Sequence, residues 1–237
     1  MGLNYLIFNG ESSLDHGAYI GGQQTFNAPQ RDVTKVKIPG RNGDLIRDNG
    51  RWLNIEVPYN LVIMDEFRDN AGEIRRWLTE PVGYSRLEDT YHPDYFRLAR
   101  VQGTIDFETA AFNLTGKTRV VFDCKPQRFL KTGEQEIAVS SGGKIYNQTQ
   151  YDSKPLIRVL GTGDGTVTIG DYVISLSGFT TEVDIDCELQ DCFYDGTSQN
   201  SKVALASGFP VLKPGNNLIS FTGDVSGVRI TGRWFTI

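Results

Sequence analysis

The sequence contains few of the residues from which catalytic and metal centres are built. Its 237 residues include only two histidines and two methionines. Neither His16 nor His92 has a partner at metal-ligand spacing, so a zinc site is disfavoured. A serine or cysteine triad has almost no candidates for its base, and no serine lies in a nucleophile elbow. We therefore expect a protein that is not an enzyme and that uses no cofactor and no metal.

Cysteine, long apolar runs and excess positive charge are also lacking. The three cysteines, Cys124, Cys187 and Cys192, are scattered and odd in number, so we expect buried free thiols and no disulfide framework. No window nears the roughly 20 apolar residues of a membrane span, and the N-terminus lacks a basic signal region. The net charge of −5 gives no electrostatic footprint for wrapping nucleic acid or anionic lipid, so we expect no specific nucleic-acid binding, and without an apolar span we expect no membrane insertion. These absences predict a soluble protein made in the cytoplasm.

Hydrophobic alternation is the strongest pattern that is present. In "TEVDIDCEL" apolar side chains occupy every second position and acidic side chains the positions between them. This period of two predicts a strand with one face in the core and the other in water. The predicted core face comprises Val183, Ile185, Cys187 and Leu189, and the predicted wet face comprises Glu182, Asp184, Asp186 and Glu188.

The acidic row allows a second interpretation. Paired carboxylates could serve glycoside hydrolysis, or supply oxygen ligands for calcium. Residues two apart on a strand lie about 7 Å apart, however, and an alternating charged face is typical of a solvated sheet. We expect the structural role.

The C-terminal part of the chain reads as an antiparallel β-sandwich. Alternating segments such as "YVISLSG" and "VRITGRW" are separated by "GTGDGT", "DGTSQN" and "KPGNN", all rich in turn residues. The first of these three looks like a phosphate-binding loop but lacks the lysine and the following helix, so we expect a hairpin turn there. Short strands with frequent turns from about residue 147 onward predict a second domain.

The N-terminal part contains one credible helix. "DEFRDNAGEIRRWLTEP" places apolar residues at spacings of four, three and four, with Asp65 as a possible N-cap and Pro81 as a stop. Gly72 costs about 1 kcal/mol relative to alanine, so packing must hold this helix. Two of the three tryptophans also occupy core-like positions. The apolar stripe comprises Phe67, Ala71, Ile74 and Leu78.

A tight corner precedes this helix. "KVKIPGRNGDL", residues 35–45, places Arg41 among a proline and two glycines in a stretch that otherwise alternates like a strand. Asn42-Gly43 and Asn49-Gly50 both have hairpin-turn chemistry, so the chain is predicted to fold back twice. The guanidinium of Arg41 either reaches a neighbouring subunit or caps its own loop, and spacing leaves both open. The basic helix face with Arg75 and Arg76 is likewise either a docking surface or a solvated flank.

Eight motifs in order give the chain a family resemblance. They are "KIPGRNGDL", "IRRWL", "YHPDYFRLARVQGTI", "VVFDCKPQRFL", "SKPLIRVLGTGDGTVTIG", "VDIDCELQDCFYDG", "FPVLKPGNNLISFTG" and "ITGRW". Each motif is weak alone, but their order over nearly the whole chain resembles the distal tail protein (Dit) family of phages with long, non-contractile tails.

The resemblance implies a mainly β protein of two domains. An N-terminal, ring-forming hub domain of strands with one α-helix (residues 1–135) is followed by a linker (136–146) and a C-terminal galectin-like antiparallel β-sandwich (147–237). It implies a homo-oligomeric ring, expected to be a hexamer, assembled in the host bacterial cytoplasm and located at the tail tip of the virion. Implied partners are the major tail tube protein, the tail-associated tip protein, and a receptor-binding protein or side fibres. DNA passes through the channel.

The resemblance also gives Arg41 a role. A ring is built from heterologous contacts, in which one patch meets a different patch at a fixed angle, and a rigid corner would hold that angle. The interface candidates are therefore Pro39, Gly40, Arg41, Gly43, Arg75 and Arg76. The alternative function is a carbohydrate-binding β-sandwich that contacts the host cell wall.

Overall fold

The computed structural model describes residues 3–22, 27–111 and 114–237. The chain forms two compact units, Met1–Arg128 together with Ile237, and Phe129–Thr236. Both units are built mainly from antiparallel strands, so the predicted mainly β fold with one helix is confirmed. No helix in the described part of the chain is long and apolar enough to cross a membrane.

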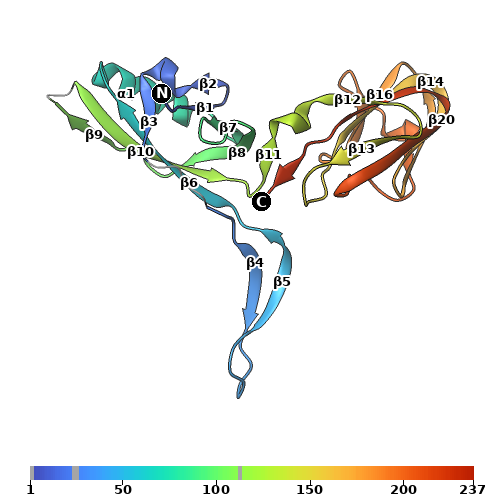
Figure 1. The fold of residues 1–237 in the computed structure, drawn as a ribbon, viewed down its shortest axis with the longest axis horizontal. Helices are drawn as coiled ribbons and strands as arrows, with labels where there is room; N and C mark the ends of the chain where they lie inside the picture. The colour runs from blue at the N-terminus through green and yellow to red at the C-terminus, as the bar shows by residue number, and fades with distance from the viewer. Residues whose placement is uncertain (1–2, 23–26, 112–113) are drawn as a thin grey trace. The chain divides into compact units, whose positions relative to one another are not determined.

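The N-terminal unit is organised around one sheet (Figure 1). Strand β9 (Phe107–Ala110) pairs with β10 at one side of it. The other strands, in spatial order, are β2 (Glu11–Ser12), β1 (Leu6–Phe8), β7 (Ser85–Asp89), β8 (Tyr95–Gln102), β10 (Thr115–Cys124), β6 (Ile55–Ile63) and β3 (Ala18–Gly21).

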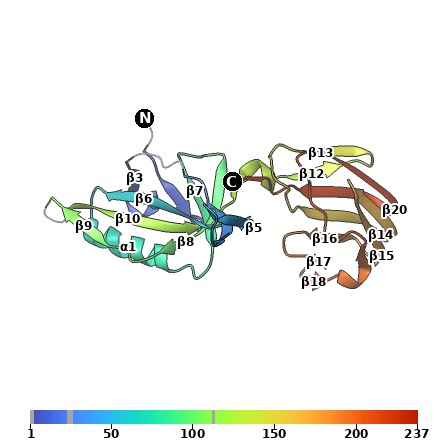
Figure 2. The same cartoon turned by 90° about the horizontal axis from the view of Figure 1, so that it is seen from below.

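The helix α1 (Phe67–Thr79) covers one face of this sheet (Figure 2). Its apolar stripe is buried as predicted, and Trp77 joins it with 3% of its surface exposed. The Trp77 indole donates a hydrogen bond to the Phe8 carbonyl at 3.0 Å, and the Phe8 ring also packs edge-on against Phe122. Tertiary packing therefore holds a helix that contains a glycine.

The predicted start of the helix is wrong. The N-cap position is Glu66, which has a left-handed φ of 44° and makes no side-chain cap. Its carbonyl accepts the amides of Asp69 and Asn70, while the Asn70 side chain donates to the Asp65 carbonyl. Asp65 thus supports the first turn through its backbone, which its residue type does not reveal.

The C-terminal unit is a second antiparallel assembly with its own core. Two 3₁₀ helices, η2 (Lys131–Glu134) and η3 (Asn200–Lys202), lie in its connections, and the short strand β11 (Arg128–Leu130) pairs with β21 (Phe235–Thr236). The remaining strands are β12 (Glu136–Val139), β13 (Gly143–Asn147), β14 (Leu156–Ile169), β15 (Tyr172–Phe179), β16 (Glu182–Asp186), β17 (Asp191–Tyr194), β18 (Thr197–Ser198), β19 (Val203–Leu205) and β20 (Gly215–Thr231).

The division of the chain differs from the expected one. Residues 136–146, expected as a linker, contribute β12 and most of β13, and both strands pair with β20. Val139 and Ile145 are buried in the core of the C-terminal unit. The unit therefore begins at Phe129, well before residue 147.

The segment "GTGDGT" is not the expected hairpin turn. It lies inside β14, where the register with β20 shifts between Leu160 and Gly165. Gly161 has a φ of 149°, and a β-carbon there would collide with the Asp224 carbonyl. The glycines let both long strands bend and contribute core residues on either side of the bend.

The strand "TEVDIDCEL" is confirmed in part. Val183, Ile185 and Cys187 are buried as predicted, but Leu189 is 71% exposed because the strand ends at Asp186. The predicted wet face is also wrong at two positions, since Asp184 and Asp186 are only 7% and 4% exposed. Each accepts two hydrogen bonds from one guanidinium, Asp184 from Arg158 and Asp186 from Arg233.

The Asp186 site predicts a pH-dependent stability. Burial raises the pKa of Asp186, but hydrogen bonds from Arg233 and from the Leu189 and Glu188 amides outweigh it and hold the pKa below its usual value. A carboxylate whose pKa is lower in the folded than in the unfolded protein stabilises the fold at every pH above its unfolded pKa of about 3.9. This stabilisation is lost as the pH falls through the folded-state pKa. We expect Asp186→Asn to lower the free energy of unfolding by about 2 kcal/mol at pH 7.

Urea unfolding followed by fluorescence measures this effect between pH 7 and pH 3. Asparagine keeps an oxygen for the two amides, so the variant removes the charge and the oxygen that accepts from Arg233 Nη2 but leaves the amide contacts in place. The difference from wild type should shrink below about pH 4. A difference that stays constant throughout would contradict the assigned ion pair.

Two glycines of the N-terminal unit give a matched test of its packing. A β-carbon at Gly116 would overlap the Phe67 ring and lie 2.7 Å from the Glu108 carbonyl oxygen, so Gly116→Ala should destabilise by about 2 kcal/mol. Gly72 lies in α1 with nothing within 4 Å of such a carbon, so Gly72→Ala should stabilise by about 0.5–1 kcal/mol. Thermal unfolding of both variants checks the opposite signs, and equal signs would contradict the helix packing.

Candidate functional site

A two-stranded hairpin is the most unusual surface of the N-terminal unit. Among the described residues, strands β4 (Arg31–Val36) and β5 (Leu45–Trp52) pair only with each other (Figure 1). Every residue from Thr34 to Arg51 is exposed, and none of them joins the core of the unit. The hairpin therefore has solvent on both faces, where a β-ribbon ordinarily has at most one wet face.

The chain folds back once here, and the second predicted turn is wrong. Asn49 and Gly50 lie within β5, where the register shifts between the pairs Arg31–Trp52 and Val33–Asp48. The Asp48 carboxylate accepts the Gly50 amide, and Gly50 has a φ of 75°. Residues that are typical of turns therefore form a β-bulge here, which twists the two-stranded ribbon without ending it.

The half of the hairpin near the sheet is held by its own charged side chains. Arg31 pairs with Asp48 at 2.9 Å, and Arg51 pairs with Asp32 at 2.6 Å. Hydrogen bonds from Asn49 and Arg51 lower the pKa of Asp32. These charges satisfy one another, so this half has no unpaired ionic group to offer a partner.

The base of the hairpin is fastened to the sheet through Asp123. This β10 carboxylate accepts hydrogen bonds from Asn54 at 2.9 Å, Tyr84 at 2.9 Å and Arg100 at 3.0 Å. Burial raises its pKa, but these three donors outweigh that effect and leave the pKa below its usual value. The exit of β5 into β6 is therefore fixed even though the hairpin beyond it has no support.

The tip contains four of the predicted interface residues. Pro39, Gly40, Arg41 and Gly43 all lie in the exposed connection between β4 and β5, and the two glycines have φ values of 76° and 82°. The Arg41 amide donates to the Ile38 carbonyl at 3.2 Å. Its guanidinium makes no hydrogen bond or ion pair within the described residues, so the loop-capping alternative is not what the structure shows.

The distal half also exposes apolar and cationic side chains together. Ile46 is 62% exposed, and Val36 and Leu45 face each other across the two strands with 43% and 49% exposed. Sequence reasoning missed these residues because apolar positions in a strand ordinarily predict a buried face. Four cations of this distal half form no ion pair within the described ranges, namely Lys35, Lys37, Arg41 and Arg47.

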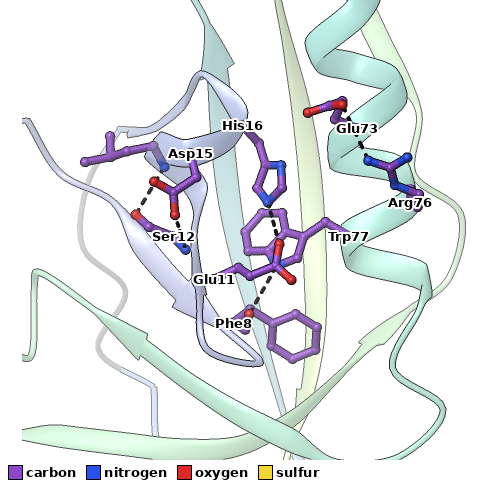
Figure 3. Close-up of polar contacts among 9 residues, drawn as sticks. Phe8, Glu11, Ser12, Asp15, His16, Glu73, Arg76 and Trp77 are labelled. Atoms are coloured by element: carbon purple, nitrogen blue, oxygen red, sulfur yellow. Dashed lines mark hydrogen bonds and ion pairs between the residues drawn. The ribbon is translucent and has the colours of Figure 1, made fainter.

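The two other predicted residues lie on α1. Arg75 and Arg76 are both exposed. Figure 3 shows Arg76 pointing away from Trp77, whose indole packs against His16 and Phe8. The Arg76 guanidinium pairs with Glu73 at 3.4 Å, and the Arg75 guanidinium lies 5.7 Å from the centre of the Phe107 ring. The structure therefore does not bring these arginines together with the tip of the hairpin.

The remaining candidate chemistry is accounted for by packing. Within the described residues, no group of three or more His, Cys, Asp or Glu side chains is placed to hold a metal ion. All three cysteines are buried free thiols, as predicted, and burial raises the pKa of Cys124 and Cys187 to about 12. A thiol that stays protonated is a poor nucleophile. His16 stacks on Trp77 with ring centres 4.6 Å apart.

Comparison with known proteins gives a structural answer only. No family model matches the chain, and no curated protein matches it significantly. The solved structure of the SPP1 Dit protein, described as a paradigm of the hub adsorption apparatus of phages that infect Gram-positive bacteria, is similar at a TM-score of 0.78 and 13% identity, with both chains fully covered.

Two structures of the phage p2 baseplate in its activated conformation are also similar. One was determined with strontium and the other with calcium, and their TM-scores are 0.51 and 0.50 at 10% identity. In both, 97% of this chain and 98% of the other are covered. Full coverage by the SPP1 protein at a high TM-score shows that this chain, despite its divergent sequence, has the Dit fold.

Proposed function

We propose that the protein is a distal tail protein, a structural hub at the tip of a phage tail that assembles as a ring of identical subunits, six in number. The observation that carries the proposal is the β4–β5 hairpin, whose distal half exposes apolar and uncompensated cationic side chains and has no contact with its own core. The fold of the whole chain, which is that of SPP1 Dit, supports the same conclusion.

The exposed hairpin would be stabilised by binding another protein. An isolated two-stranded ribbon is at best marginally stable in water, and its outer edges leave backbone amides and carbonyls unpaired. Burying the exposed Ile46 side chain alone would contribute about 1–2 kcal/mol. A partner that covers one face or pairs with one edge therefore supplies what the hairpin lacks.

Charge favours a second copy of the same chain as that partner. Residues 31–54 contain six Lys or Arg side chains and three Asp side chains, which gives this segment a net charge of +3. Since the whole chain has a net charge of −5, the remainder has −8. A basic arm on an acidic body is complementary to the body of its neighbour, which guides association and suppresses wrong pairings.

A head-to-tail contact of this kind closes into a ring when its angle is fixed. The contact is heterologous, because the arm of one subunit meets the body of the next. Pro39, Gly40 and Gly43 shape the corner that presents Arg41, whose planar guanidinium suits a carboxylate of the neighbour. Arg75 and Arg76, on the exposed face of α1, lie at the subunit interface or the lumen of the ring.

The other parts of the proposed function are those of a structural hub that has no catalytic activity. The ring continues the tail tube formed by the major tail tube protein, and DNA passes through it without specific binding. The C-terminal unit holds a receptor-binding protein or side fibres, and the tail-associated tip protein docks on the other side. The protein acts at the tail tip of the virion after assembly in the host cytoplasm.

Substitutions in the hairpin should separate assembly from folding. We expect Ile46→Glu and Arg41→Ala each to weaken ring formation by about tenfold or more, the equivalent of about 1.4 kcal/mol per contact. Light scattering after size exclusion measures the mass, and electron microscopy of stained particles shows whether closed rings remain. At concentrations too low for assembly, the unfolding temperatures should stay unchanged, because neither side chain belongs to the core.

Leu189→Glu is the matched control. Leu189 is 71% exposed on the C-terminal unit, close to the 62% of Ile46, so the substitution introduces the same charge at a comparable site. It should leave the ring intact. If all three variants form rings as readily as wild type, the hairpin is not the subunit contact and the proposal is wrong.

A further inference from the structure

A half-buried arginine in the N-terminal unit, Arg97, has no role in the proposed hub. Arg97 lies on β8 two residues before Ala99, which is fully buried. Its partner on the neighbouring strand β7 is Leu87, which is 2% exposed. Because alternate residues of a strand share a face, Arg97 lies on the core side of the sheet. A charged residue on that side requires a compensating partner.

Among the described residues, Arg97 makes no hydrogen bond or ion pair, although the charge of Asp89 acts on it. Its Nη1 atom is buried and has no hydrogen-bond acceptor. Burial lowers the pKa of Arg97, yet a guanidinium remains charged at any physiological pH. An unpaired buried polar atom destabilises the folded state, and a charged one does so more. The arginine is therefore retained at a cost in stability.

The carboxylate whose charge acts on Arg97, that of Asp89, already accepts other hydrogen bonds. Asp89 accepts hydrogen bonds from the Tyr59 hydroxyl at 2.6 Å and the His92 amide at 2.7 Å, and its Oδ1 lies 3.3 Å from His92 Nδ1. It makes no ion pair with Arg97 among the pairs formed by described residues. Burial and the Asp89 charge raise the pKa of Tyr59 well above its usual value, so this hydroxyl stays protonated.

A cavity of about 240 Å³ opens beside these groups. This is several times the roughly 30 Å³ that one water occupies, so it accommodates a small molecule. A smaller recess shares Tyr59, Asp89, His92 and Arg97 and adds Arg128 to its wall. The polar side chains that line the main cavity are Asn27, Tyr59, Asn60, Asp89, Tyr91, His92, Arg97 and Arg119.

We propose that this cavity binds a small oxyanion, a carboxylate or phosphate, with the Arg97 guanidinium as its principal ligand. Two arginines line the cavity against one carboxylate, which favours an anion over a cation. The guanidinium fork matches the two oxygens of a carboxylate or phosphate. Asn60 and Arg119 provide further donors at the mouth, where Arg119 is exposed.

Anion-dependent stabilisation tests the site on the full chain. Wild type should gain more thermal stability from inorganic phosphate or citrate than from sodium chloride at equal ionic strength, and more than Arg97→Gln gains from the same anions, because these anions also stabilise proteins without a site. Isothermal titration calorimetry with the same two anions gives the affinities. We expect Arg97→Gln to abolish the specific shift and Arg119→Gln to weaken binding by about tenfold.

Two further variants make the result decisive. Arg68→Gln, an exposed arginine of α1, should bind as wild type does. Asp89→Asn removes the opposing charge and should tighten binding, which keeps the test valid even if Arg97→Gln fails to fold. The site is refuted if wild type responds to phosphate and citrate no more than to chloride, or if both arginine-to-glutamine changes in the cavity leave binding unaltered. This inference does not depend on ring assembly, which the same proteins report separately by their mass.

Discussion

The unpaired edges of the β4–β5 hairpin are the constraint on which the functional account depends. A backbone amide or carbonyl that meets neither protein nor water is costly, and an exposed edge that does meet water is a template for another strand or surface. Here the edge is combined with exposed apolar side chains and with cations that find no counter-ion in the distal half. Few soluble proteins leave such a ribbon exposed unless something else covers it.

The sheet explains how such an arm is held at a defined angle. Asp123 fixes Asn54 at the point where β5 leads into β6, and the ion pairs of Arg31 and Arg51 stiffen the adjoining half. Only the distal half is without internal support. The protein therefore combines a rigid base with a tip that depends on its environment, which suits a repeated contact between identical subunits.

Much of this architecture could be predicted from the sequence, and the failures have physical causes. The stripe of α1 and the core face of β16 follow directly from hydrophobic period. The same period could not show that Asp184 and Asp186 are buried, because their partners Arg158 and Arg233 lie 26 and 47 residues away in sequence. Asn49-Gly50 has the chemistry of a turn but forms a bulge, since the choice depends on the pairing strand.

The candidate sites show the same limit. Arg41 could be placed on a tight corner from its glycines, but the exposure of Val36, Leu45 and Ile46 could not, because alternation looks the same whether a face packs on its own core or on another chain. Arg97 gave no signal at all, since its environment is assembled by β6, β7 and β8 together. Long-range pairing, which a single sequence does not record, decides each of these cases.

Hydrogen exchange of the hairpin amides, measured as a function of protein concentration, tests the central claim most directly. Exchange reports whether each backbone amide is protected by a partner. The account predicts that amides of β4, of β5 and of the tip between them exchange rapidly in the isolated subunit and become protected as the assembled particle forms. Hairpin amides that exchange equally fast in both states, while a larger particle does form, would contradict it.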